Sequence, residues 1–400
     1  MIAQAIAYYL LFTLFRAVYS LCLGFCYVHD YPKVSRKKQP IVSVVIPARN
    51  EKVGITKTVN SVLASTYRNL EVIVVNDGST DSTKTSVKRI IKKHKNKVSL
   101  INQSHQGKYS ALNNGIMHSK GEIIVTIDAD SYVEPNAIKL LADGLSDKSV
   151  DAVVGKIVVG LGKSRKKKLS QKIVQLVQFF EYMFGYHMKK AQHENNSIYI
   201  LPGAFAAIRK SAIEAAGYYE GYSKTEDFDI SMKIKMKGGR ISYVDDAVCV
   251  TEAASDIKSL INQRTRWRHG FLVCLLHRKE YLFNRKKGTM LTFVDFPFVL
   301  LGIMDIFLYP IFLVFTISQV IYSEDWLLLG IFYLIIPYAY LMMFDKDIIS
   351  HKKLLFLLPY IPIMFTVINM VEYIALLRAS YRIIMRKDTE WTNWVRVGLK

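Results

Sequence analysis

The stretch Ile123-Ile124-Val125-Thr126-Ile127-Asp128-Ala129-Asp130 decides how this chain folds. Five residues that favour β structure run directly into two carboxylates separated by one small residue. An apolar run of this length, entered from Gly121 and left through Ser131, predicts a buried parallel strand. Ligands of open α/β sheets bind beyond the carboxyl ends of the strands. The two carboxylates therefore lie where a ligand crevice is expected.

Two carboxylates in such a crevice repel each other unless a cation lies between them. Mg²⁺ or Mn²⁺ on a diphosphate fits best, because these ions prefer oxygen ligands and share them with substrate phosphates. Taken alone, the pattern is more often a strand that ends in a solvated, Asp-rich turn. The rest of the chain decides between these two interpretations.

The residues before this stretch alternate between strand and helix patterns. Strands are expected at 41–46, 70–75 and 98–102, and helices at 54–63, 84–95 and 108–118. Such a series predicts a mostly parallel, doubly wound α/β sheet. Polar residues also follow the first two strands, at 47–51 and 76–79. Three strand ends then line one crevice, within a domain expected over residues 41–253.

The net charge of the chain limits the classes of partner that it could bind. The 400 residues include 54 Lys and Arg against 33 Asp and Glu, a net charge of +21. A charge of this size indicates nucleic acid, an anionic membrane surface or an anionic substrate. Basic residues flank apolar stretches, at 33–38 and 278–287, which is the positive-inside pattern and argues against nucleic acid. The four cysteines show neither disulfide nor zinc spacing, so we expect a reduced, cytoplasmic catalytic part on the cell membrane.

Residues 1–28 are expected to form an N-terminal transmembrane helix, because they are apolar, long enough to cross a bilayer and lack a cleavage site. A C-terminal transmembrane region is expected over 291–378, followed by a basic tail over 379–400. Its apolar stretches lie at 297–322, 326–344 and 354–377. Three crossings would place the tail outside, whereas its charge favours the inside. A re-entrant or interfacial third stretch, which contains Pro359 and Pro362, would resolve the conflict.

Ionisable residues interrupt these apolar stretches at Arg16, Asp305 and Glu372. Such groups usually face the interior of a helix bundle or a wet cavity. If the first two spans run in opposite directions, Arg16 and Asp305 lie about 18 Å and about 12 Å from their cytosolic ends, at about 1.5 Å per residue. We hypothesise that the two pair; the alternative is that the span limits are wrong and both lie near an interface.

Two further segments, 169–187 and 256–287, carry apolar residues at helical spacing. A core helix of a globular domain has the same pattern. Next to membrane spans, a helix that lies in the interface is equally consistent with it, and we expect interfacial helices over 254–290.

Four motifs in this chain resemble those of a known family. They are Asp77, the Asp128-Ala129-Asp130 pair, Thr225-Glu226-Asp227 and Gln263-x-x-Arg266-Trp267. Their order and spacing, over roughly residues 41–275, are similar to those of the membrane-integrated, processive family 2 glycosyltransferases. That group includes poly-N-acetylglucosamine, hyaluronan, chitin-oligosaccharide and cellulose synthases. The resemblance implies a GT-A catalytic domain attached to a helical transmembrane bundle.

The resemblance also implies a role for each matching residue. Asp227 would be the general base for the acceptor hydroxyl, and Asp128 and Asp130 would hold the metal. The implied donor-binding residues are Pro47, Glu51, Asp77, Lys108, Asp128, Gln263 and Arg266. The implied acceptor-binding residues are Trp267, Glu226, Thr225, Gly203 and Ala204.

The chemistry of these residues agrees with such roles. Displacing a nucleoside diphosphate requires cationic charge on the leaving group, from a metal, Lys108 and Arg266. A single carboxylate suffices as the base for direct inversion. Glu226 beside Asp227 could raise the pKa of that base through like-charge repulsion. Trp267 offers an aromatic face that suits a sugar ring, although a tryptophan at this depth is also a common interfacial anchor.

The resemblance therefore implies an inverting, Mg²⁺- or Mn²⁺-dependent β-glycosyltransferase. Its expected donor is a UDP-sugar. UDP-N-acetylglucosamine is favoured, because the amino-acid sequence around residues 225–227 and 263–270 resembles that of the poly-N-acetylglucosamine type. Its acceptor would be a growing polysaccharide, exported through its own spans, and an accessory membrane subunit is compatible with this scheme. The alternatives are a glycolipid synthase that adds one sugar to a lipid, a hyaluronan- or cellulose-type synthase, and a non-catalytic membrane scaffold or transporter.

Overall fold

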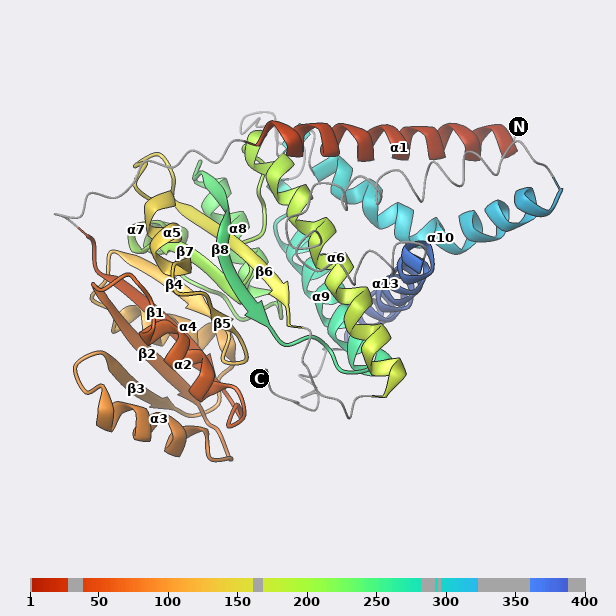
Figure 1. Cartoon of the computed structure of the whole chain (residues 1–400). Coiled ribbons are helices and arrows are strands. Elements are labelled where there is room, and N and C mark those ends of the chain that lie inside the picture. The colour runs from red at the N-terminus through yellow and green to blue at the C-terminus, as the bar shows by residue number, and fades with distance from the viewer. Residues whose placement is uncertain are drawn as a thin grey trace.

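The structure is a computed structural model that describes residues 2–27, 39–160, 168–281, 292–293, 296–322 and 360–387. Its centre is one mixed sheet covered by helices on both faces (Figure 1). A second group of helices packs against one end of this sheet and continues into α1 (Ile2–Cys26) and α10 (Phe296–Tyr322). In Figure 1 these two helices extend together away from the sheet.

The sheet has the strand order β3-β2-β1-β4-β7-β6-β8-β5. Its strands are β1 (Val42–Ala48), β2 (Leu70–Asp77), β3 (Val98–Gln103), β4 (Ile123–Ile127), β5 (Tyr132–Val133), β6 (Ala152–Val159), β7 (Phe205–Arg209) and β8 (Ile241–Thr251). The first four in this order are mutually parallel, as predicted. β6 and β8 pair in parallel and have the same direction as these four, so the prediction of a mostly parallel sheet is confirmed. The sheet is nevertheless mixed, because β7 runs antiparallel to both β4 and β6, and β5 antiparallel to β8. The long connection between β6 and β7 leaves the sheet and returns in the opposite direction.

Alternating residues of each central strand build two separate cores. Val44 and Val125 belong to one core, with apolar residues of α2 (Ile55–Leu63), α3 (Thr83–Lys93) and α5 (Ala137–Gly144). Val45 and Ile124 belong to the other, with α4 (Lys108–Met117), α7 (Lys210–Ala216) and α8 (Glu226–Met236). Because successive side chains of a strand point to opposite faces, a strand buried on both sides reads as a continuous apolar run. The prediction of a buried strand at 123–127 is confirmed.

A third core joins helices that are distant in sequence. Apolar residues of α6 (Leu169–Glu194), α9 (Ile257–His277) and α13 (Ile361–Ile384) are buried against each other. The predicted helices at 169–187 and 256–287 therefore exist, and the second ends at His277 and is followed by the short helix η1 (Lys279–Tyr281). Their location at a membrane interface stays a prediction.

Among the described residues, the segment Ile363–Ile384 has the length and hydropathy of a membrane span, and Val299–Phe315 is a shorter apolar segment. The predicted stretch 326–344, the linker around 29–38 and most of the basic tail lie outside the described residues. The predicted transmembrane bundle therefore stays a prediction.

Arg16 and Asp305 do meet, as hypothesised. The Arg16 guanidinium donates to Asp305 Oδ2, which joins α1 to α10. Tyr9 donates a second hydrogen bond to Asp305 Oδ1, at 2.6 Å.

Candidate active site

The carboxyl ends of three parallel strands meet at one edge of the sheet. Pro47 is the penultimate residue of β1, Asp77 ends β2, and β4 leads into Asp128 and Asp130. β1 pairs in parallel with both β2 and β4, so the three ends lie side by side. All four residues line one cavity of about 400 Å³, which confirms the predicted crevice.

Asp77 is fixed in this cavity by the loop that precedes α4. Its Oδ1 accepts hydrogen bonds from Gln103 Nε2 and the Gln106 N–H, both at 2.9 Å. Its Oδ2 lies 2.7 Å from His105 Nδ1 and accepts from the Gly107 N–H at 3.1 Å. Burial would raise the pKa of Asp77, but the hydrogen bonds from Gln106, Gln103 and His105 outweigh it and lower the pKa. Asp77 is therefore a positioned anion.

Lys108, the first residue of α4, joins carboxylates from two other elements. Its Nζ lies 2.7 Å from Asp128 Oδ1 and 3.2 Å from Glu226 Oε1. Burial alone would lower the pKa of Lys108, but the charges of Asp128, Glu226 and Asp227 raise it well above its ordinary value. Gly203 permits this placement, because a Cβ there would lie 2.8 Å from the Lys108 Nζ.

Glu226 and Asp227 form the first turn of α8, and Thr225 occupies its N-cap position. Asp227 Oδ2 accepts a hydrogen bond from the Gly203 N–H at 3.1 Å. Burial raises the pKa of Glu226, Lys108 opposes the rise, and the charges of Asp227 and Asp128 add to it. The expected repulsion between the adjacent carboxylates thus acts on Glu226.

A second cavity, of about 460 Å³, adjoins the first. Asp227, Thr225, Gly203, Ala204 and Trp267 line it, which brings together the predicted base and the predicted acceptor residues. Six residues line both cavities: Lys108, Asp128, Asp130, Lys224, Glu226 and Arg266. The predicted donor residues Glu51 and Asp77 line only the first cavity. The site therefore consists of two compartments that share one charged wall.

The motif helix α9 contributes to this wall and to the second cavity. Arg266 lines both cavities, whereas Gln263 and Trp267 line the second. Gln263 is buried, and its Oε1 accepts no hydrogen bond within the described part of the chain. A buried amide oxygen without a donor is suited to a ligand that brings one.

Asp128 and Asp130 fit a divalent cation that arrives with a ligand. Within the described residues, no group of three or more His, Cys, Asp or Glu side chains could hold a metal ion alone. Mg²⁺ sites typically use one or two carboxylates, and substrate phosphates and water complete the coordination. Two carboxylates at the junction of the cavities match that pattern. The residues therefore fit a metal bound together with a diphosphate.

Known proteins match this chain over its sheet domain. Residues 43–217 match the sequence profile described as Glycosyl transferase family 2. This stretch is a family 2 glycosyl transferase domain. The poly-β-1,6-N-acetyl-D-glucosamine synthase of Staphylococcus aureus (strain COL) is 27% identical over 280 residues, which are 67% of this chain and 65% of that protein. The probable glycosyltransferase YdaM of Bacillus subtilis is 31% identical over 258 residues, 63% of this chain and 60% of that protein.

The fold has a match among solved structures. The mannosyltransferase PcManGT of Pyrobaculum calidifontis, solved in complex with GDP-Man and Mn²⁺, superposes with a TM-score of 0.62 at 19% identity. The superposition covers 96% of this chain and 99% of that chain. The family 2 transferase domain of this chain thus has a GT-A-like mixed sheet. The sequence matches span about two thirds of the length of the first relative.

Sequence reasoning missed one wall of the candidate site. Glu181, Tyr182, Tyr186 and Lys189 project from α6 into the second cavity. Burial raises the pKa of Glu181 to about 7, with Arg264 opposing the rise. Their spacing was visible as a helix pattern, but the pattern does not reveal which face meets the site.

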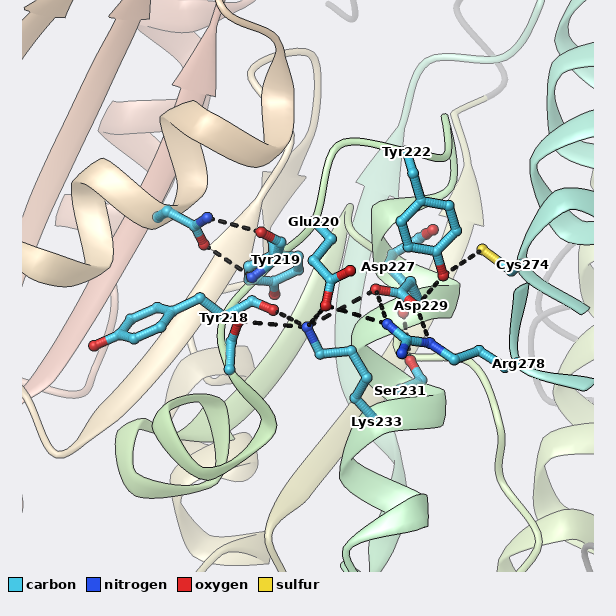
Figure 2. A network of polar contacts seen from close by, with 12 residues as sticks. Tyr218, Tyr219, Glu220, Tyr222, Asp227, Asp229, Ser231, Lys233, Cys274 and Arg278 are labelled. Atoms are coloured by element: carbon cyan, nitrogen blue, oxygen red, sulfur yellow. Dashed lines mark hydrogen bonds and ion pairs between the residues drawn. The ribbon is translucent and has the colours of Figure 1, made fainter. Parts of the chain in front are cut away.

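A buried charge network holds α8 in place (Figure 2). Asp229 is fully buried and accepts from the Tyr222 hydroxyl and from Arg278 Nε at 3.1 Å. Glu220 Oε1 accepts from Lys233 at 2.8 Å and from Arg278 at 3.2 Å. The network ties α8, which carries the predicted base, to the preceding loop and to the end of α9.

Proposed function

We propose that the chain is an inverting, metal-dependent β-glycosyltransferase that transfers a sugar from a UDP-sugar to a growing polysaccharide. UDP-N-acetylglucosamine is the favoured donor, in keeping with the name of the Staphylococcus aureus relative. The proposal places the protein on the cell membrane with a cytoplasmic catalytic domain, and couples synthesis to export through its own helices.

One observation carries the proposal: the two cavities meet at a wall of cationic and anionic side chains beside Asp227. The first cavity, with Asp77 and Glu51, suits the nucleotide of the donor. The second, with Trp267 and α6, suits the acceptor sugar. A donor and an acceptor bound in these compartments would meet at Asp128, Lys108 and Asp227.

In the proposed reaction, Asp227 takes the proton of an acceptor hydroxyl while the oxygen of that hydroxyl attacks the anomeric carbon of the donor sugar. The bond from that carbon to the diphosphate oxygen breaks, and UDP leaves with the bonding electrons. Lys108 and Arg266 line both cavities and are placed to offset the charge that grows on the diphosphate. A cation held by Asp128 and Asp130 would supply further Lewis-acid stabilisation to that leaving group.

The test is UDP release by the purified, detergent-solubilised chain across a panel of UDP-sugars, with Mg²⁺ or Mn²⁺ and with the products sized. We expect turnover of one donor, loss of turnover in EDTA, and a ladder or high-mass product. Asp227→Asn should reduce transfer by at least about 10²-fold, the usual contribution of a general base. The same variant should still bind the donor.

Glu220→Gln is a matched control, because Glu220 lies near α8 but lines neither cavity. Full transfer by Asp227→Asn would contradict the role of the base. A single-sugar lipid product would favour the glycolipid synthase. A lipid acceptor could reach the second cavity along α13, because Glu372 of that helix lines the cavity. No turnover of any donor, in membranes as well as in detergent, would contradict the proposed activity.

A further inference from the structure

A four-residue ion cluster joins α6, α9 and α13 beside the second cavity. Arg264 Nη2 donates to Glu181 Oε2 at 2.6 Å, and its Nε lies 3.5 Å from Glu372 Oε1. Glu372 Oε2 accepts from Arg268 Nε at 2.6 Å. Arg264 is only 2% exposed, so its charge depends on these carboxylates. All four residues line the second cavity.

The same arginine contacts the aromatic residue of the motif. The Arg264 guanidinium carbon lies 4.1 Å from the centroid of the Trp267 ring, within the range of a cation–π contact. A flat ring has two faces, and Arg264 covers one. Trp267 also lines the second cavity, and the face that Arg264 leaves uncovered is the one on which a sugar ring could stack.

Glu372 is distant in sequence from the family 2 domain, which matches residues 43–217. It lies in α13, the described helix with the length and hydropathy of a membrane span. Apolar residues of α13, including Ile368 and Val371, pack against α6 and α9 in the third core. Burying the Glu372 carboxylate, which is 8% exposed, is unfavourable unless cationic partners offset the loss of hydration. Its two partners, Arg264 and Arg268, lie on either side of Trp267 in the sequence.

We infer that Glu372 is a positioning residue of the acceptor site: with Glu181 it holds Arg264 against one face of Trp267, so that the other face meets the acceptor only when α13 is docked on α9. The inference rests on the proposed function for the identity of the acceptor. The position of the Trp267 ring does not depend on that identity and can be measured by itself.

The first experiment compares Glu372→Gln with wild type in the full chain. Glutamine keeps the shape of the side chain but removes the charge that opposes Arg264 and Arg268. With short oligosaccharides of the donor sugar as acceptors, we expect the acceptor KM to rise about tenfold. The donor KM and the hydrolysis of donor without acceptor should change less than about twofold. Asp305→Asn is the matched control, because it also removes a paired carboxylate from an apolar helix but lies outside both cavities.

The second experiment needs no turnover. Trp267 is left as the only tryptophan by replacing the other three of the chain's four with phenylalanine. Glu372→Gln should then raise the quenching of Trp267 fluorescence by acrylamide, and Asp305→Asn should not. If Glu372→Gln does not fold, Glu181→Gln removes the more exposed partner of Arg264 and should shift both readouts in the same direction.

An unchanged acceptor KM and unchanged quenching in a folded variant would overturn the inference. An equal loss of donor hydrolysis and transfer would also overturn it, because general damage to the domain would then explain the effect. Absence of turnover in wild type would defeat the proposed function alone, and the quenching measurement would still decide whether Glu372 positions Trp267.

Discussion

Lys189 of α6 is a lysine in the wall of the second cavity whose charge the fold disfavours. Burial lowers the pKa of Lys189 to about 8, although the nearby charge of Asp227 raises it. Its Nζ makes one long hydrogen bond, of 3.4 Å, to the carbonyl of Ile200. A charged amine that the fold disfavours, in the wall of the proposed acceptor cavity, is placed to bind sugar hydroxyl groups.

We predict that Lys189→Met stabilises the chain by about 1 kcal/mol at pH 7 while it weakens acceptor binding. The unfolded pKa is 10.5, so between pH 8 and pH 10.5 the unfolded state binds more protons, and wild type gains stability as the pH rises. The advantage of the variant should therefore shrink from pH 8 upward. Thermal unfolding from pH 7 to pH 10 measures this.

Lys190→Met is the control for that measurement, because the neighbouring Lys190 is paired with Asp245 at 3.0 Å. This change should not stabilise the chain at any pH. A Lys189→Met variant that is less stable than wild type at pH 7 would contradict the prediction. It would show that interactions of the Lys189 amine outweigh the loss of hydration on burial.

At the scale of elements, α8 depends on the buried network behind its first turn. Asp229 accepts hydrogen bonds from α9 and from the loop before α8, and its side chain is 0% exposed. We predict that Asp229→Asn costs about 3 kcal/mol, because it leaves Arg278 without its buried counter-charge. Transfer should fall as well, since Asp227 lies on the same helix. Denaturant unfolding and UDP release together measure the effect.

Glu220→Gln provides the comparison within the same network. Glu220 pairs with Lys233 and Arg278 as Asp229 does, but its side chain is 42% exposed. Exposed ion pairs contribute less than about 1 kcal/mol, so this variant should stay close to wild type. Equal costs for the two variants would mean that burial does not determine the strength of the network.

The elements that the sequence predicted well are those whose signal is local. The strands and helices before Asp130 follow from apolar runs and turn residues, and parallel pairing then brings Asp77 and Asp128 to one edge. The reversed strand β7 and the cavity wall on α6 depend on tertiary packing, which no local pattern encodes. Glu372 illustrates both the reach and the limit of sequence analysis. The sequence shows a carboxylate within an apolar stretch, but only the fold shows that Arg264 lies beside it.

For the whole molecule, the apolar helices α1, α10 and α13 are joined to each other and to the rest of the described chain at defined polar contacts. Glu372 ties α13 to the motif helix α9, and Arg16 ties α1 to α10. The Tyr27 hydroxyl donates to the carbonyl of Tyr243 at 3.0 Å, which anchors the end of α1 to strand β8. Polar contacts between apolar helices specify register, because the apolar surfaces alone do not.

The Arg16–Asp305 pair allows the register of α1 against α10 to be tested. Arg16→Asp and Asp305→Arg should each destabilise the chain by about 3 kcal/mol, because each places two like charges together in an apolar environment. The double variant restores opposite charges and should recover at least about half of the summed loss, the signature of direct coupling in a double-mutant cycle. Recovery should stay incomplete, because Tyr9 loses the carboxylate that it donates to. Thermal unfolding in detergent and in lipid bilayers measures the cycle, and additive losses without recovery would show that the two helices do not depend on this contact.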